Sequence, residues 1–574
     1  MTDQQTSILV RQIAAGTLSR RRFLQRAVAL GLTAPAISAV LAAAAEAAPG
    51  SVPPSTARAF QADASTLILA DNMSSGGLWL SLDPAYFYEP NPSAAMNVVY
   101  ETLYHIPDTT RPDYFEPLLA DGEPQVSEDG TEVTIKIRTG LTFHATGNEM
   151  TAEDWVYSLD RVKLVQGSPS YLASYWDKVE AVDPTTIKFT LPGPNPALVA
   201  ILTSSALSVT DSKVVKAQGG IDATTAGTPE PEAPHAFLTD NSAGTGPFVL
   251  ASWDVDTEVV LERNPDYWGD PATLERIIFR NVADGNAQLQ AVQGGEADVA
   301  FSLDPDAVEQ VTSDPNLQLL STPSISLEYL AMHTQEDPGG PLANPDLRRA
   351  ISHAIDYDGI INDLLKGAAV RPPTVVPLPL PGSEEVQDLA LTTDLARAQE
   401  LFDAAGVGEI ELSLSFRAEG AGAGGLLEET LATKIQSDLQ QINGLTIKLN
   451  PMDANQWIDD YRASKLQMTL APWGPDYPDV LSYVEPFGKT DTQVAARVGY
   501  SNTAVDEALA RAAQAKDAAA RETEYAAIQR QLIEDAPYAV LYQPTFQNPA
   551  RKSVQGVTSH FAYTLQLRGA SKTE

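Results

Sequence analysis

Two aromatic rings and two carboxylates gather in one short stretch, Pro472-Trp-Gly-Pro-Asp-Tyr-Pro-Asp479. A cation that leaves water needs a partner, and a carboxylate beside aromatic faces offers both charge pairing and cation–π attraction. The three prolines of the stretch restrict its backbone. The predicted ligand contacts here are Trp473, Gly474, Asp476 and Tyr477. The alternative interpretation is that the rings belong to the core and that Asp476 only caps a turn.

A second candidate is the glycine-rich loop Glu419-Gly-Ala-Gly-Ala-Gly-Gly425, which stands between a predicted strand and a predicted helix. Glycine lets backbone N–H groups approach a ligand closely, so Glu419 and Gly420 join the predicted contacts. The loop also has the G-x-G-x-x-G spacing of dinucleotide-binding turns. That alternative requires an acidic residue about 20 positions further on, at the end of the next strand. The nearest one is Asp453, beyond Pro451, so we favour a solute over a dinucleotide.

Side chains for metal or covalent chemistry are sparse. The chain has six histidines and no cysteine, and no histidine pair has the spacing of metal ligands. It contains no G-x-S-x-G elbow, H-E-x-x-H pair or kinase signature. We expect no cofactor, no metal and no catalytic residue.

The N-terminal segment has the parts of an export signal. Basic residues cluster at Arg20-Arg-Arg22, and an apolar alanine-rich run follows and ends in small residues near Ala45. The paired arginines resemble a twin-arginine (Tat) signal. The alternative, an uncleaved anchor, needs about 20 strongly apolar residues, whereas this run contains Gly31 and Pro35. We predict that residues 1–47 are a cleaved Tat signal peptide and that the protein is periplasmic, with no lipid anchor because no cysteine can carry one.

Composition restricts the partners and the architecture. The net charge is −37, with 75 acidic and 38 basic residues, so nucleic acid and anionic lipid are not expected partners. This acidity suits a saline habitat and a plain solubility surface equally well. A chain of 574 residues exceeds what one hydrophobic core usually serves, so two or three domains are expected.

Strand and helix patterns alternate along the chain, which predicts a mixed α/β fold. A capping box at Thr151 and an N-cap at Asn344 mark two helix starts. Residues 216–242 show little periodicity and are predicted to be a surface excursion. Strands are predicted at 66–70, 133–137, 247–250, 412–416 and 445–449, with a helix at 426–439 between the last two.

Several strings, taken in order, resemble the family 5 extracellular solute-binding proteins, the peptide, opine and nickel class that feeds ATP-binding-cassette (ABC) importers. Each string is weak alone, but together they cover nearly the whole chain after the signal. The strings are Ser81-Leu-Asp-Pro84, Val126-Ser-Glu-Asp-Gly130, Gly140-Leu-Thr-Phe-His144, Met150-Thr-Ala-Glu-Asp154, Gly244-Thr-Gly-Pro-Phe248, Arg263-Asn-Pro-Asp-Tyr-Trp268, Val292-Gln-Gly-Gly-Glu-Ala-Asp298 and Leu347-Arg-Arg-Ala-Ile351.

The resemblance implies a two-lobed periplasmic-binding-protein clamshell of the large class, with a split first lobe that closes on the ligand by hinge motion. We place lobe one at residues 60–322 plus 537–574 and lobe two at 323–536. The hinge crossings would be Ser326-Leu-Glu-Tyr329 and Ala536-Pro-Tyr-Ala-Val540. Further predicted ligand contacts are Tyr329 in the hinge, and Asn72 and Met73 in the polar loop after the first strand.

The resemblance also bears on the ligand. In peptide-binding relatives an aspartate three residues after such a tryptophan pairs with the ligand's ammonium group, and Asp476 stands at that position. Dipeptide-binding relatives carry an arginine for the ligand carboxylate in the glycine-rich loop. This loop has only glycine and alanine there, with Arg417 at the end of the preceding strand, so a free dipeptide is disfavoured. Capture of nickel or haem, other uses of the family, is disfavoured by the histidine spacing.

The leading hypothesis is a monomeric periplasmic receptor that captures a peptide or amine-bearing solute. Its expected partners are that ligand, the permease subunits of an ABC importer and, during export, the Tat translocase. An exported hydrolase without a cofactor is the rival from another class, and a chemoreceptor-coupled sensor of the same fold stays open as well.

Overall fold

The computed structural model describes residues 64–73, 79–87, 92–109, 111–220, 233–301, 303, 307–515, 517–562 and 564–573. These residues belong to one compact unit, Asp63–Glu574. The predicted Tat signal peptide at residues 1–47 lies outside them. In the described parts of the chain, no helix combines the length and the apolar character that crossing a membrane requires.

A 12-stranded mixed sheet is the largest element of the unit, and its main path runs β16-β15-β17-β13-β18-β11-β1-β10-β9-β8. Strands β12 and β14 pair with β18 beside this path. The predicted alternation of strands and helices is confirmed. The strands are β1 Thr66–Asp71, β8 Phe248–Asp254, β9 Glu258–Arg263, β10 Arg276–Asn281, β11 Val299–Ala300, β12 Leu317–Pro323, β13 Leu327–Met332, β14 Ala369–Val370, β15 Ile410–Arg417, β16 Leu445–Met452, β17 Met468–Trp473 and β18 Tyr538–Arg551.

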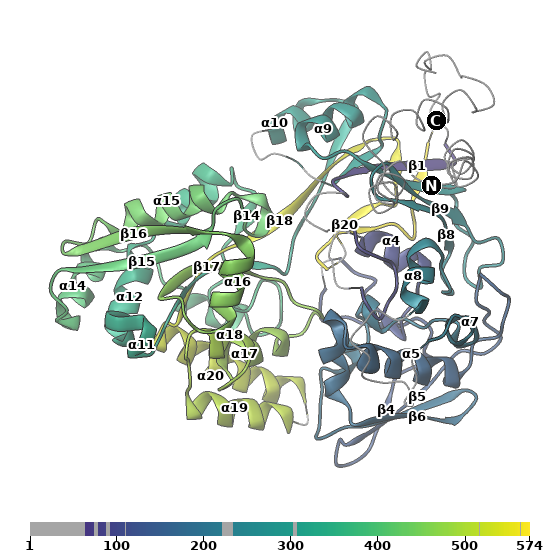
Figure 1. Cartoon of the computed structure of the whole chain (residues 1–574), viewed down its shortest axis with the longest axis horizontal. Helices are drawn as coiled ribbons and strands as arrows, with labels where there is room; N and C mark the ends of the chain where they lie inside the picture. The colour runs from purple at the N-terminus through teal and green to yellow at the C-terminus, as the bar shows by residue number, and fades with distance from the viewer. Residues whose placement is uncertain are drawn as a thin grey trace, which may run out of the picture. The chain divides into compact units, whose positions relative to one another are not determined.

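The 14-residue strand β18 changes partners along its length (Figure 1). Its first half pairs antiparallel with β13 and β14, and its second half pairs with β12 and β11. The change occurs at Pro544, whose carbonyl accepts a hydrogen bond of 2.9 Å from the Ser324 amide between β12 and β13. One half of the sheet contains β13–β17, and the other half contains β1 and β8–β12. Strand β18 and the short connection between β12 and β13 join these two halves. The lobe boundaries given above stay a prediction.

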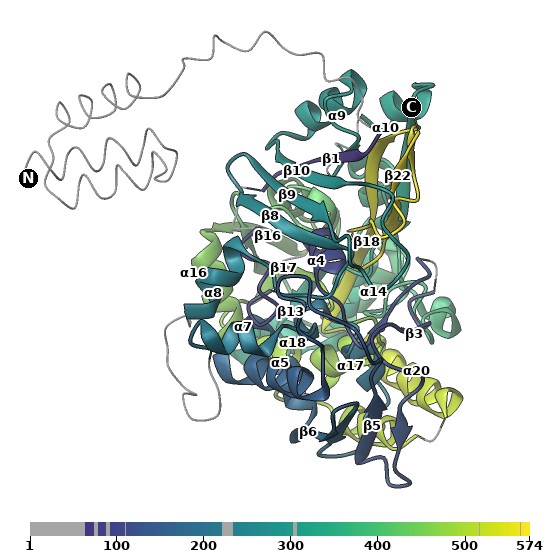
Figure 2. The ribbon, with the colours of Figure 1, turned by 90° about the vertical axis from the view of Figure 1, so that its right-hand side faces the viewer.

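A separate four-stranded antiparallel sheet, β4-β5-β7-β6, packs with helix α5 Ala152–Val165 on a second core (Figure 2). The predicted capping box is present, since Asp154 Oδ2 accepts hydrogen bonds of 2.9 Å from the amide and hydroxyl of Thr151. The 3-10 helix η1 Ser168–Tyr175 follows α5. The strands are β4 Gln125–Val126, β5 Glu132–Lys136, β6 Lys178–Asp183 and β7 Thr186–Thr190.

The predicted β-loop-α-β unit is confirmed as β15, α15 Glu428–Leu439 and β16, with β15 and β16 parallel. Asn344 caps α12 Pro345–Ala354 by accepting a hydrogen bond from the Asp346 amide at 2.9 Å. The remaining longer helices of this half are α14 Leu395–Ala405, α16 Ala454–Arg462, α17 Leu481–Gly488, α18 Gln493–Arg497, α19 Thr503–Ala513 and α20 Ala518–Asp535.

The other half of the unit carries shorter elements. The excursion predicted at 216–242 lies partly outside the described residues, but its end forms α8 Ala233–Asp240, which the weak periodicity did not indicate. Helices here are α4 Ser93–Val99, α6 Leu198–Ile201, η2 Ser205–Leu207, α7 Ser212–Ala217, α9 Gly285–Gly294 and α10 Val308–Ser313. Two-stranded pairs are formed by β2 Tyr104–His105 with β3 Glu116–Pro117, β19 Val554–Gln555 with β22 Ser571–Lys572, and β20 Thr558–His560 with β21 Thr564–Gln566.

A buried ion pair ties α5 to the segment after β1. The guanidinium of Arg161 donates to both carboxylate oxygens of Asp83 at 2.6 and 2.7 Å, and the two side chains are 1% and 0% exposed. Burial alone would raise the pKa of Asp83, but Arg161 and the adjacent His235 hold that pKa at about 2. The pair thus stays ionised into strongly acidic solution.

We predict that Arg161→Met lowers the free energy of unfolding by about 3–5 kcal/mol, because the substitution leaves a buried carboxylate without its bidentate partner. Chemical denaturation at neutral pH measures the loss. Arg111→Met is the matched control, because Arg111 pairs with Asp113 at the surface and its removal should change stability by less than about 0.5 kcal/mol. Equal losses in the two variants would contradict the structural role of the pair.

Candidate functional site

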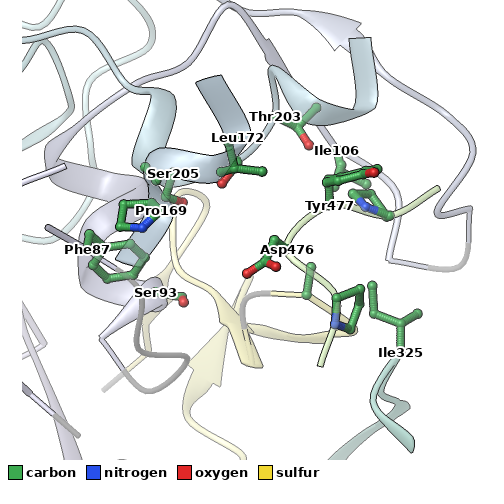
Figure 3. Close-up of a pocket in the computed structure, with 15 residues that line it drawn as sticks. Phe87, Ser93, Ile106, Pro169, Leu172, Thr203, Ser205, Ile325, Asp476 and Tyr477 are labelled. Carbon is green, nitrogen blue, oxygen red and sulfur yellow. The ribbon is translucent and has the colours of Figure 1, made fainter. Parts of the chain in front are cut away.

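A cavity of about 120 Å³ lies where the loop after β17 meets α4, η1 and η2. Figure 3 shows the carboxylate of Asp476 among the side chains that line it. Ser93, Thr203, Ser204 and Ser205 provide hydroxyl groups, and Phe87, Ile106, Leu172 and Ile325 provide apolar contacts. A mostly apolar lining with a few polar groups is the usual composition of a solute site.

Among the described residues that line this cavity, Asp476 has the only acidic side chain. Its Oδ2 accepts a hydrogen bond from the hydroxyl of Tyr171, a residue of η1 that is 305 positions away in the sequence. Pro475 and Pro478 flank it and also line the cavity, so the carboxylate stands on a conformationally restricted loop. Asp476 therefore faces the space in which a ligand would lie.

For Tyr477 the sequence left two interpretations open, a ligand contact and a core residue, and the structure has features of both. It lines the cavity, yet it is 4% exposed and packs in the core around β5 and α5. Its hydroxyl lies 2.9 Å from the hydroxyl of Tyr175, and the two rings meet edge to face at 5.9 Å. Burial raises the pKa of Tyr175 to about 12, so this pair of phenols stays neutral.

Trp473 and Gly474 immediately precede that part of the loop and are not among the lining residues. The indole N–H of Trp473 donates to the carbonyl of Ser482 at 3.2 Å, and its ring meets Phe487 edge to face at 5.4 Å. A side-chain carbon on Gly474 would meet only Ser326 Oγ, at 3.7 Å. In this structure Trp473 packs against α17 at the start of the loop and does not line the cavity.

The three remaining predicted contacts outside the glycine-rich loop lie away from the cavity lining. Met73 is buried in the core around β1, and its amide donates to Asn281 Oδ1 at 3.0 Å. The Asn72 amide donates to Asp71 Oδ1 at 2.8 Å. Tyr329 is fully buried, with its hydroxyl 3.0 Å from that of Tyr461. Their role in binding stays a prediction.

The glycine-rich loop folds back on its own strand. Glu419 is exposed, and the Gly420 amide donates to the Arg417 carbonyl at 3.0 Å. The Arg417 side chain pairs with the buried Glu428, its Nε donating to Oε1 at 2.7 Å. The Ala423 amide donates to Glu328 Oε2 at 2.7 Å. Since a loop amide faces a carboxyl group, this geometry disfavours a dinucleotide phosphate there.

The cavity includes residues that sequence reasoning missed. Leu172 lines the cavity and Tyr171 donates to Asp476, and both belong to η1, a short helix without a distinctive pattern. Ser204 precedes the short helix η2, and Ser205 begins it. Only the tertiary fold brings these segments to the loop after β17, so local spacing could not identify them.

Ion-binding side chains do not gather in the part of the chain that the structure describes, where no group of three or more His, Cys, Asp or Glu residues could hold a metal. His144 is structural: its Nε2 accepts from the Gly244 amide at 3.2 Å, and burial lowers its pKa to about 4. His235 lies beside the Asp83–Arg161 pair, with its Nδ1 3.3 Å from Oδ2 of Asp83.

Comparison with known proteins gives relatives across most of the chain. A probable D,D-dipeptide-binding periplasmic protein of Escherichia coli (strain K12), DdpA, is 26% identical over 434 residues, covering 75% of this chain and 80% of that protein. A glutathione-binding protein of Pectobacterium atrosepticum, GsiB, is 27% identical over 497 residues, covering 84% and 90%.

Solved structures share the fold. CtaP, an ABC transporter substrate-binding protein of Listeria monocytogenes, matches with a TM-score of 0.75 at 22% identity, covering 89% of this chain and 100% of that one. HbpA2 of Haemophilus parasuis matches with a TM-score of 0.74 at 24% identity and the same coverage. The predicted α/β two-lobed binding-protein fold is therefore confirmed.

The family described as bacterial extracellular solute-binding proteins, family 5 Middle, matches residues 115–494, which is more than half of the chain. This stretch contains most of the strings that carried the resemblance and the loop with Asp476. The protein belongs to the family 5 bacterial extracellular solute-binding proteins.

Proposed function

We propose that the protein is the substrate-binding component of an ABC importer and that it captures a small peptide or another amine-bearing solute. The observation that carries this proposal is the carboxylate of Asp476, which lines the cavity beside hydroxyl groups and apolar side chains. Two relatives, a probable D,D-dipeptide-binding protein and a glutathione-binding protein, support a ligand of peptide character.

The chemistry of capture follows from the partners of Asp476. Before binding, the Tyr171 hydroxyl donates a hydrogen bond to the carboxylate of Asp476. The Tyr171 phenol is a neutral donor, whereas a ligand ammonium group brings a positive charge as well as N–H donors to the carboxylate. The hydroxyls of Ser93 and Ser205 and the ring of Phe87 then contact the rest of the ligand. This is recognition without bond making or breaking, so we propose that the protein is not an enzyme.

The proposed binding cycle uses the connection between the halves of the sheet. With lobe one at 60–322 plus 537–574 and lobe two at 323–536, the cavity draws on both lobes, because the lining residues Leu172 and Asp476 stand in different ones. Closure would bend the chain near Ser324 and Pro544, where β18 changes partners. Residues 538–543, which pair with β13 and β14, would then move with lobe two, so the proposed bend lies beyond the boundary predicted at 537. The importer's permease subunits would then receive the closed, loaded form of a monomer.

We predict that Asp476→Ala weakens binding of the native ligand by about 2–5 kcal/mol, since an ammonium group would be left unpaired in a closed cleft. At about 1.4 kcal/mol per decade this is roughly thirtyfold to several-thousandfold. The ligand is identified by native mass spectrometry of protein purified from its own cells, and affinities are measured by calorimetric titration.

Two controls accompany that measurement. Asp459→Ala removes the same charge from an exposed face of α16 and should leave the affinity unchanged. The unliganded Asp476→Ala protein should lose only about 1 kcal/mol of stability, the value of one hydrogen bond with Tyr171. Affinity within about threefold of the parent would show that Asp476 is only a turn residue.

Closure itself is testable by small-angle X-ray scattering. We predict a smaller radius of gyration when the protein is saturated with its ligand, because hinge closure brings two lobes together. Identical scattering profiles with and without ligand would identify a rigid binding module instead.

We further propose export to the periplasm by the Tat route. Replacing Arg20 and Arg21 with lysine keeps the charge and removes the paired arginines of the signal. The precursor should then accumulate in the cytoplasm, as measured by immunoblotting of cell fractions. Normal amounts of mature protein in the periplasm would refute the Tat assignment.

A further inference from the structure

Glu328 is a fully buried carboxylic acid in β13, next to the connection between the halves of the sheet. It is 0% exposed. On one side of β13 its register partner is Pro472 of β17, and on the other side it is Tyr542 of β18. The pairing with β18 shifts register between Glu328 and Tyr329, so the strand is irregular at this residue.

The glycine-rich loop covers the carboxyl group of Glu328. Oε2 accepts the hydrogen bond of 2.7 Å from the Ala423 amide, whereas Oε1 has no hydrogen-bond partner among the described residues. The Tyr542 hydroxyl on the paired strand is likewise buried and unpaired within that part of the chain. A side-chain carbon at Gly422 would stand 2.7 Å from Oε2, so a larger residue there would have to displace the carboxyl group.

The same loop rests on the connecting strand. Gly424 has a φ of +80°, and a side-chain carbon there would stand 2.7 Å from Cβ of Pro544. Pro544 is the residue at which β18 changes partners and to whose carbonyl Ser324 donates. One short segment, residues 422–424, therefore contacts both the buried acid and the connection between the two halves.

The charged groups around Glu328 favour its neutral form. Burial raises the pKa of Glu328 to about 8; the Ala423 N–H lowers it, Glu428 of α15 raises it, and Arg417 of β15 lowers it. Arg417 is itself engaged by Glu428, and Tyr542 is the titratable group that faces Glu328 from β18. An ionised carboxylate without a full set of partners is costly to bury.

We propose that Glu328 is a positioning residue that latches the glycine-rich loop onto the β13–β18 connection while its carboxyl is neutral and releases the loop when it ionises. Loop opening lets water reach the carboxyl, so each opening at neutral pH releases a proton. This latch makes the opening of the loop depend on pH. Because the loop contacts the connection that bends during closure, closure would depend on pH as well. Only this last role, in closure, rests on the proposed function.

The sign of the effect follows from the two states of the acid. The closed loop holds the pKa at about 8, and the open loop returns it toward the ordinary 4.5. Stability of the closed loop is therefore fully present below about pH 4.5 and is lost as the pH rises to about 8. For one linked proton the opening constant should rise about tenfold per pH unit in that window and level off above it.

Amide hydrogen exchange of residues 420–426 between pH 5 and 9, corrected for the intrinsic exchange rate, measures this opening. Amides of β5, in the separate four-stranded sheet, are the internal reference. In the parent protein we expect the predicted rise to pH 8. Glu328→Gln keeps an acceptor for the Ala423 amide and cannot ionise, so its loop should stay closed with no pH slope.

Glu328→Ala removes the acceptor, so its loop should open at every pH. An opening constant of the parent that does not change with pH would overturn the proposal, and so would a Glu328→Gln variant that keeps the slope. The parent's profile decides the question even if a variant fails to fold. Scattering that shows no change with ligand would refute the hinge closure of the proposed function and leave the latch intact.

Discussion

The continuity of β18 is the constraint on which the rest of the structure depends. Its backbone forms hydrogen bonds with strands of both halves of the largest sheet, so neither half can move without altering the geometry at Pro544. Buried backbone groups must stay paired, so the proposed closure would bend the sheet where the partners change. The residues that line the cavity come from before and after the connecting segment at Ser324, so the proposed closure would change the shape of the cavity.

The sequence predicted those parts of the fold that local patterns determine. The capping box at Thr151, the N-cap at Asn344 and the β-loop-α-β unit around 412–449 are all confirmed, because their hydrogen bonds join residues close in the chain. Helix α8 was missed, since its periodicity is weak. Sheet order could not be predicted from such patterns, because it depends on pairings such as β1 with β10, more than 200 residues apart.

The candidate site divides in the same way. Asp476 and Tyr477 could be predicted because they lie in a stretch rich in proline, aromatic rings and carboxylates, and both line the cavity. Tyr171 has no local signal, because its partner is 305 residues away. Glu328 lies in the predicted hinge crossing Ser326-Leu-Glu-Tyr329 without a predicted role of its own. An acid between apolar residues is nevertheless a signal, because it has to find partners, stay neutral or be exposed.

Two carboxyl groups near the connection between the halves of the sheet illustrate how environment assigns a role. Asp476 stands on a loop beside a cavity, where a phenol already donates to it and a charged ligand can replace that donor. Glu328 lies under backbone, with one amide as its donor and another acid nearby, so its neutral form is favoured. The first is suited to bind a cation and the second to hold a loop. In a chain with a net charge of −37, acids are abundant, and the surroundings that the fold builds around each one decide which of them can act on a ligand.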